Sequence, residues 1–185
     1  MGKKYQGKYR GSSARLQSWD YGRNASYFIT VNTRSRIHYF GSIINGGMQL
    51  TEAGCIALKY WNEIPIHFPF VHLGAFIVMP DHVHGIISIQ KEQTPGNNTG
   101  NGNKSTAFQG EIALTPGQKR FRNQGKGTLS SIVGSYKSVV SKNIRLFLPD
   151  FAWQPRFHDH IIREPRTYMI ITKYIENNPK NWKDR

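Results

Sequence analysis

Two histidines lie inside an apolar run near the middle of the chain, in the stretch MPDHVHGIISI at residues 79–89. On an extended strand, successive side chains alternate between faces. His82 and His84 are therefore predicted to point the same way, with Cα atoms roughly 6.6 Å apart, while Val83 points to the opposite face. Two imidazoles so placed can converge on one ion at about 2.0–2.2 Å and leave other positions for water, a third side chain or a phosphate oxygen. The motif predicts a metal site on a sheet.

Two alternatives accompany this interpretation. One is that a histidine of the pair is a hydrogen-bonded core residue and the other faces a wet edge. The other is that the metal site lies at His158 and His160, which flank Asp159. A charged middle residue is typical of an edge strand or a loop, so this second pair ranks behind the first.

The chain carries an excess of positive charge. Its 185 residues hold 25 Lys and Arg against 11 Asp and Glu, a formal net charge of +14. The cations occur throughout the chain, which favours a nucleic-acid partner over mere solubility or attachment to an anionic membrane. Predicted nucleic-acid contacts are the cations of a basic, aromatic N-terminal arm and those around Phe121: Lys3, Lys4, Lys8, Arg10, Arg15, Arg23, Lys119, Arg120, Arg122 and Lys126.

Other compositional features narrow the class of protein. No apolar run approaches the ~20 residues of a membrane-spanning helix, and the first residues lack the apolar segment of a signal peptide. The sequence thus predicts a cytoplasmic protein without membrane contact. Its one cysteine, Cys55, lies inside a helical pattern and is predicted to be a small core residue.

The elements that must position the histidines can be predicted from apolar periodicity and turn residues. Strands are expected at 26–33, 71–79, 82–89 and within 153–163, with short extended pieces on either side of Asn45-Gly46-Gly47. Helices are expected from the N-cap Thr51 to about residue 67, from Thr128 to Pro149, and from Pro165 to a stop at Pro179. Pro80-Asp81 separates two strands that must be antiparallel neighbours.

This order of elements predicts an α+β fold of the ferredoxin-like type, with an antiparallel sheet and helices packed on one face. One domain is expected at 26–185, because a chain of this length closes one core. The arm at 1–25 and a mobile loop at about 91–127, which is poor in apolar residues, lie outside that core.

Several blocks of the chain resemble a known family. PDHVHGII is similar to the His-hydrophobe-His signature of HUH single-strand endonucleases. ARLQSWDYG, YFITVNT, GSYKS, the segment 153–163 and YIENNP followed by Trp182 resemble, in the same order, the REP-associated tyrosine transposases, a single-tyrosine branch of bacterial transposases. The resemblance covers nearly the whole chain from about Ala14.

The resemblance implies a nucleophilic tyrosine on a helix near the C-terminus. Tyr174 occupies the position similar to the family's nucleophile, whereas Tyr136 lies in the apolar stripe of its helix and is predicted to be a core residue. Asn178, one turn after Tyr174, corresponds to the polar side chain that completes the metal site with His82 and His84 in related transposases. The alternative for Tyr174 is a packing residue.

The function implied by the resemblance is cleavage and rejoining of single-stranded DNA near hairpins of repetitive extragenic palindromic (REP) elements, through a 5′-phosphotyrosine and with Mg²⁺ or Mn²⁺. The family includes forms that act alone and forms that act as dimers, so a homodimer stays open. Two other functions remain: a non-catalytic protein that binds DNA or RNA hairpins, and a metal-dependent hydrolase that uses water.

Overall fold

The computed structural model describes residues 4–5, 8–9, 19–92, 125 and 127–183. Its main sheet has the strand order β6-β7-β3-β8, with every neighbouring pair antiparallel. The four strands are β3 (Ala25–Asn32), β6 (Val71–Met79), β7 (His82–Ile89) and β8 (His158–Ile162). With a helix after β3 and another after β7, this order is the ferredoxin-like topology, which confirms the predicted α+β class and antiparallel sheet.

The remaining strands form two small ladders. β1 (Lys4–Tyr5) pairs with β2 (Lys8–Tyr9), and β4 (Gly41–Ile44) pairs with β5 (Gly47–Leu50). The turn of the second hairpin consists of Asn45 and Gly46, with φ of 52° and 73°. These are the left-handed conformations that a two-residue hairpin turn requires, and they confirm the turn predicted there.

Two threonines begin the long helices as predicted. The Oγ1 of Thr51 accepts the N–H of Gly54 at 3.2 Å at the start of α1 (Glu52–Asn62), which is followed by the short α2 (Ile64–His67). Thr128 caps α4 (Leu129–Ile144) in the same way. The side-chain oxygen in each case satisfies an N–H that has no partner within the helix.

The predicted end of α4 was wrong. Pro149 does not end this helix, which stops five residues earlier at Ile144. Ile144 is the last buried residue of the helix, while Leu146 and Phe147 are exposed, so the apolar face that stabilises the helix ends there.

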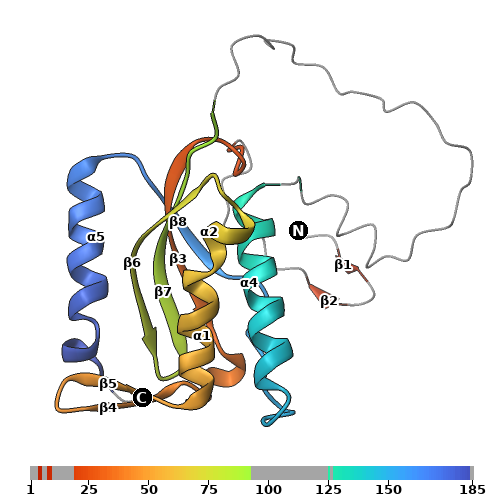
Figure 1. Cartoon of the computed structure of the whole chain (residues 1–185), viewed down its shortest axis with the longest axis vertical. Helices are drawn as coiled ribbons and strands as arrows, with labels where there is room; N and C mark the ends of the chain where they lie inside the picture. Colours follow the sequence, from red (N-terminus) through yellow and green to blue (C-terminus); the bar gives the residue numbers. More distant parts are fainter. Residues whose placement is uncertain (1–3, 6–7, 10–18, 93–124, 126, 184–185) are drawn as a thin grey trace, which may run out of the picture.

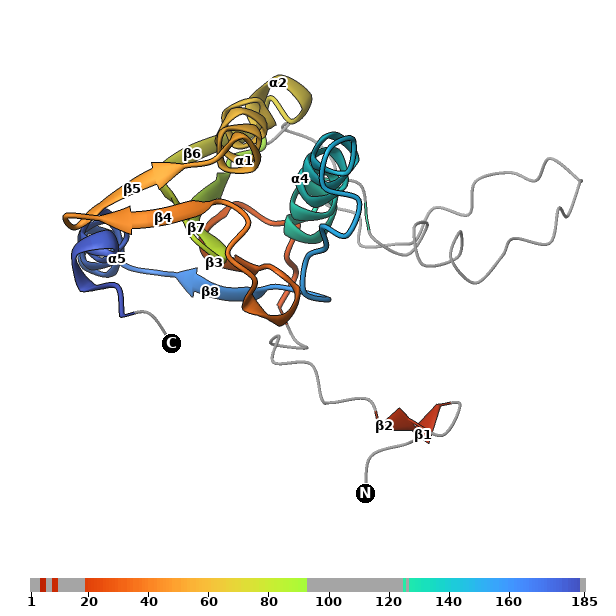
Figure 2. The same ribbon diagram turned by 90° about the horizontal axis from the view of Figure 1, so that it is seen from below.

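Helices cover both faces of the sheet. Figures 1 and 2 show α1 and α4 on one side and α5 (Pro165–Asn177) on the other. The expectation of helices on one face therefore holds for α1 and α4 and is wrong for α5. The larger core lies under α1 and α4, and a second apolar cluster of Ile86, Ile162 and Ile175 lies under α5.

Two glycines permit close packing on the sheet. A Cβ on Gly85 would lie 2.3 Å from the ring of Trp61, and a Cβ on Gly74 would lie 2.3 Å from the hydroxyl of Tyr168. Both distances are shorter than non-bonded atoms allow, so only glycine lets α1 and α5 approach the strands this closely. The approach of α5 brings its buried Ile175 onto Ile86 of β7.

Two expectations about composition can be compared with the fold. Cys55 is exposed on α1 and is not the core residue predicted, because the buried face of that helix is formed by Ala53, Gly54, Ala57 and Trp61. No helix within the described ranges is long and apolar enough to cross a membrane.

Candidate active site

The two histidines of β7 converge on one point. His82 and His84 point toward α5, and Val83 points into the larger core, as predicted from strand alternation. The Nε2 atoms of His82 and His84 lie 3.0 Å apart, and both side chains are about 6% exposed. The converging pair therefore lies at a nearly dry position on the sheet.

Each imidazole is held from behind by a second polar group. The Nδ1 of His82 lies 2.5 Å from Oδ1 of Asp81, and the Nδ1 of His84 lies 2.8 Å from Oγ1 of Thr30 on the neighbouring strand β3. Such partners fix the orientation of each ring. The carboxylate of Asp81 can only accept, so it favours the proton on Nδ1 of His82, whereas the hydroxyl of Thr30 can donate or accept. The two Nε2 atoms face each other at hydrogen-bond distance.

The electrostatics keep His84 neutral. Burial, followed by the charge of His82, lowers the pKa of His84 to about 3. A neutral imidazole offers the lone pair that a metal ion binds. Burial alone would raise the pKa of Asp81, but the hydrogen bond with His82 and the charges of His82, Arg36 and His38 hold it below its usual value. The side chain next to His82 is thus a carboxylate that accepts a hydrogen bond.

The pair fits a divalent ion. Two ligands at right angles and about 2.1 Å from one ion would be about 3.0 Å apart, which matches the separation of the Nε2 atoms. No cluster of three His, Cys, Asp or Glu occurs among the residues that the structure describes, so further ligands would be an amide, water or a phosphate oxygen. Mn²⁺ accepts imidazole more readily than Mg²⁺, which prefers oxygen.

Tyr174 lies beside the pair. Its ring centroid is 5.5 Å from that of His84 and 6.0 Å from that of Phe28, and its side chain is 51% exposed. Ile175, the next residue of α5, is buried against the sheet, so Tyr174 lies at the margin of the helix where it contacts both the histidine and solvent. A phenol so placed is not a buried packing residue.

Asn178 follows directly after α5 and is 9% exposed. Its backbone keeps helical angles, with φ of −57° and ψ of −43°, so the residue continues the helical path by one turn from Tyr174. The role of its amide as a third ligand stays a prediction.

Tyr136 is a core residue, as predicted. It is 2% exposed, its hydroxyl donates to the carbonyl of Ala57 at 3.1 Å, and burial raises the pKa of its phenol. A phenol with a bonded proton and no access to solvent is a poor nucleophile.

The alternative histidine pair is differently placed. His158 and His160 are exposed on the edge strand β8, where they pair with Thr30 and Phe28 of β3. The edge position that the charged Asp159 predicted is confirmed. His158 and His84 both pair with Thr30, so they lie on the same face of the sheet on either side of β3.

Most of the predicted DNA-contacting cations lie outside the described residues: Lys3, Arg10, Arg15, Lys119, Arg120, Arg122 and Lys126. Lys4 and Lys8 belong to the small ladder of β1 and β2. Arg23 is exposed, with its guanidinium carbon 4.7 Å from the ring centroid of Trp19. Their contacts with nucleic acid stay a prediction.

Three site residues were missed from the sequence. Asp81 was interpreted only as part of a turn, although its position next to His82 could have indicated the hydrogen bond. Thr30 depends on the register of β3 against β7, which no local pattern reveals. Trp182, whose ring centroid is 5.7 Å from that of His82, depends on the path of the chain after α5.

Comparisons with known proteins show which sequences and structures this chain resembles. No family model matches the chain. An uncharacterized protein of Haemophilus influenzae is 33% identical over 183 residues, which cover 95% of this chain and 92% of that protein. A solved structure of a REP-associated tyrosine transposase bound to a REP hairpin matches with a TM-score of 0.57 and 20% identity, covering 91% of this chain and 73% of that one. The resemblance stated from the sequence is thus confirmed at the level of the fold.

Proposed function

Since the chain belongs to the same family as the Haemophilus influenzae protein and has the fold of a REP-associated tyrosine transposase, we propose that it cleaves and rejoins single-stranded DNA near hairpins. The observation that carries this proposal is the contact between Tyr174 and the converging pair of His82 and His84 within one chain. A nucleophile beside a metal-binding pair is what transfer of a phosphodiester requires.

The chemistry assigned to Tyr174 is attack on a phosphodiester of the bound strand. Its phenolic oxygen forms a bond to phosphorus, the bond from phosphorus to the 3′ oxygen breaks, and that oxygen leaves as a 3′-hydroxyl after taking a proton. The phenol loses its own proton as the new bond forms. The product is a 5′-phosphotyrosine, which a 3′-hydroxyl can later attack to rejoin DNA without a nucleotide cofactor.

The histidines and their partners prepare the phosphate for this attack. A divalent ion, Mg²⁺ or Mn²⁺, held by His82 and His84 would polarise the scissile phosphate. Asp81 and Thr30 keep the two Nε2 atoms aimed at one point, and Asn178 is the proposed third protein ligand. The ring of Trp182 packs beside His82, with the two ring centroids 5.7 Å apart.

The proposed partner is DNA that forms a hairpin, since the transposase with this fold was solved with a REP hairpin bound. Because Tyr174 contacts His84 of its own chain, one chain brings the nucleophile and the histidine pair together. We therefore propose that cleavage by a monomer is sufficient, and that a homodimer is not needed to assemble the site.

The proposal is tested by incubating the protein with hairpin DNA and Mn²⁺ and looking for a protein–DNA adduct that resists denaturation. Wild type should form it and Tyr174→Phe should not. Tyr168→Phe, on the same helix, is the matched control and should keep the adduct. DNA binding without cleavage would favour the non-catalytic hairpin binder, and cleavage without an adduct in wild type and Tyr174→Phe alike would favour a hydrolase that uses water.

A further inference from the structure

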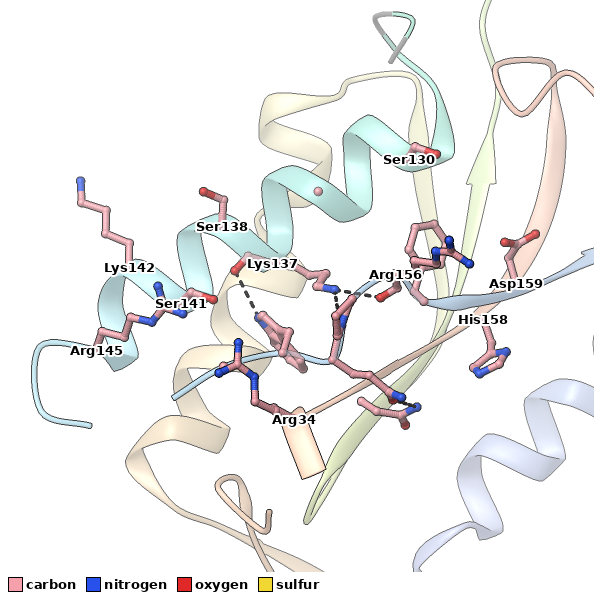
Figure 3. A pocket seen from close by; sticks show the side chains of 17 residues that line it. Arg34, Ser130, Lys137, Ser138, Ser141, Lys142, Arg145, Arg156, His158 and Asp159 are labelled. Carbon is pink, nitrogen blue, oxygen red and sulfur yellow. Dashed lines mark hydrogen bonds between the residues drawn. The ribbon is translucent and has the colours of Figure 1, made fainter. Parts of the chain in front are cut away.

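A large open groove lies beside the candidate active site, between α4 and the segment that leads into β8 (Figure 3). Its volume is about 1220 Å³, above the range of roughly 300–1,000 Å³ that is common for pockets of small molecules. Such a space suits an extended ligand more than a compact one.

The lining of the groove is strongly cationic. Figure 3 shows Arg34, Lys142 and Arg145 toward one end, and Arg156, His158 and Asp159 toward the other. With Lys137, five Lys and Arg side chains line the groove against one carboxylate, that of Asp159, among the described residues. This balance favours a polyanion over a neutral or cationic ligand.

The side of α4 that lines the groove has small and mostly polar residues. The groove is lined from α4 by Ser130, Gly134, Ser138 and Ser141. Figure 3 shows the three serines along this helix. Small side chains let a chain of phosphates approach the helix closely, and hydroxyls can donate to phosphate oxygens.

The opposite wall is fixed to α4 by a lysine. The Nζ of Lys137 donates to the carbonyl oxygens of Gln154 and Arg156, each at 2.8 Å. Arg156 adopts a φ of 68°, which is uncommon for a residue with a Cβ. The two hydrogen bonds from Lys137 hold this conformation and so preset the position of one groove cation.

A chain of polar contacts connects the groove to the histidine pair. Asn32 lines the groove, donates from its amide to the side-chain carbonyl of Gln154 at 3.1 Å, and accepts from the guanidinium of Arg36 at 2.6 Å. Arg36 in turn lies 3.4 Å from Asp81, the partner of His82. In the sheet, Asn32 is the register partner of His82, so one end of the groove adjoins the candidate site.

We propose that this groove binds the single-stranded DNA segment next to the scissile phosphate, through contacts with its phosphates. A strand that is to be cut has to pass the histidine pair, and Asn32, which lines the groove, is the register partner of His82. The inference rests on the proposed function, because it takes the histidine pair to be the place of cleavage. It assigns DNA contacts to Arg34, Lys142, Arg145 and Arg156, in addition to those predicted for the arm and the loop.

The test compares the affinity for two DNA hairpins, one blunt and one with a single-stranded flank of about six nucleotides, by fluorescence anisotropy. The variant Arg34→Gln/Arg145→Gln removes two groove charges, and its amides can still donate hydrogen bonds. This matters because the Nε of Arg145 donates to the carbonyl of Phe151 at 2.8 Å. The matched control Lys59→Gln/Arg166→Gln removes the same charge from exposed positions on α1 and α5, outside the groove.

The groove variant should bind the flanked hairpin about tenfold more weakly than wild type, since each exposed pairing of a cation with a phosphate supplies on the order of threefold in affinity. The slope of log affinity against log salt should fall in magnitude by about 1.4, or about 0.7 for each single-strand phosphate that no longer pairs with a cation. Binding of the blunt hairpin should stay unchanged. The control variant should lose less affinity for the flanked hairpin than the groove variant.

Equal losses on both hairpins would overturn the inference, because the groove would then hold the duplex stem. The inference is also overturned if the groove variant binds each of the two hairpins with the same affinity as wild type does. If thermal unfolding shows that the variant is not folded, Arg34→Gln/Lys142→Gln, which keeps the hydrogen bond from Arg145 to Phe151, replaces it with the same expected result.

The covalent adduct separates this inference from the proposed function. Wild type should form the adduct and Tyr174→Phe should not, whatever the affinities of the groove variant. An adduct with no selective loss of flanked-hairpin affinity would refute the groove and leave the function standing. A selective loss of affinity with no adduct in any variant would refute the function and leave a DNA-binding groove.

Discussion

The hydrogen bond between Asp81 and His82 offers a direct test of the metal site. Both side chains are 6–7% exposed, and Nδ1 and Oδ1 lie 2.5 Å apart. The substitution Asp81→Asn keeps the size of the side chain and removes its charge. We expect the affinity for Mn²⁺ to fall about 10- to 100-fold, or about 1.4–2.7 kcal/mol, because a ligating histidine then loses the carboxylate that orients it and increases its basicity.

Isothermal titration with Mn²⁺ measures this loss without any need for catalysis. Asp150→Asn is the matched control, because Asp150 is exposed and its backbone carbonyl, not its side chain, accepts the hydrogen bond from Tyr39. The control should bind Mn²⁺ as wild type does. An Asp81→Asn protein that is folded and binds Mn²⁺ within twofold of wild type would refute the role assigned to this carboxylate.

Three further predictions concern the scaffold. Tyr136→Phe should lower the free energy of unfolding by about 0.5–1.5 kcal/mol in denaturant titrations, because the hydrogen bond from its hydroxyl to the carbonyl of Ala57 is lost, and the DNA adduct should be unaffected. Burial lowers the pKa of Lys137 from 10.5 to about 8. Between these two pH values the unfolded chain therefore binds more protons at this lysine than the folded chain does. The contribution of Lys137 to the free energy of unfolding should rise as the pH increases from about 8 to about 10.5. That rise should be missing in Lys137→Gln, and a parallel pH profile of the two proteins would contradict it. Gly85→Ala should destabilise the fold by about 1–3 kcal/mol, because the new methyl group collides with Trp61; an unchanged melting temperature would show that the ring moves aside at no cost.

The main elements of the fold could be predicted because their signals are local. The helix starts at Thr51 and Thr128, the turn at Asn45-Gly46 and the antiparallel pair around Pro80-Asp81 all depend on a few neighbouring residues. The orientation of His82 and His84 follows from strand alternation alone. None of these features requires knowledge of a distant segment.

The features that could not be predicted depend on contacts between distant segments. The position of α5 on the second face of the sheet is stabilised by Ile86 and Ile175, which are 89 residues apart along the chain. Thr30 behind His84 and Asn32 beside the groove follow from the register of β3 and β7. The groove is formed by α4 and the segment leading into β8, and its cations are scattered from Arg34 to Arg156.

Only part of the candidate active site could be predicted from the sequence. The histidine pair has a local spacing that indicates its chemistry, whereas Tyr174 gained its role from the resemblance and not from its neighbours. The structure adds the contact of its ring with His84. An exposed tyrosine next to Ile175 would otherwise be interpreted as an ordinary surface residue of an amphipathic helix.

The most direct test of the account is to identify the residue that carries DNA after cleavage. Hairpin DNA with a single-stranded flank is incubated with wild type and Mn²⁺, the adduct is digested with protease and nuclease, and the modified peptide is sequenced by mass spectrometry. The account predicts a nucleotide 5′-phosphate attached to the phenolic oxygen of Tyr174. A nucleotide on any other residue, or cleaved DNA with no modified peptide, would contradict it.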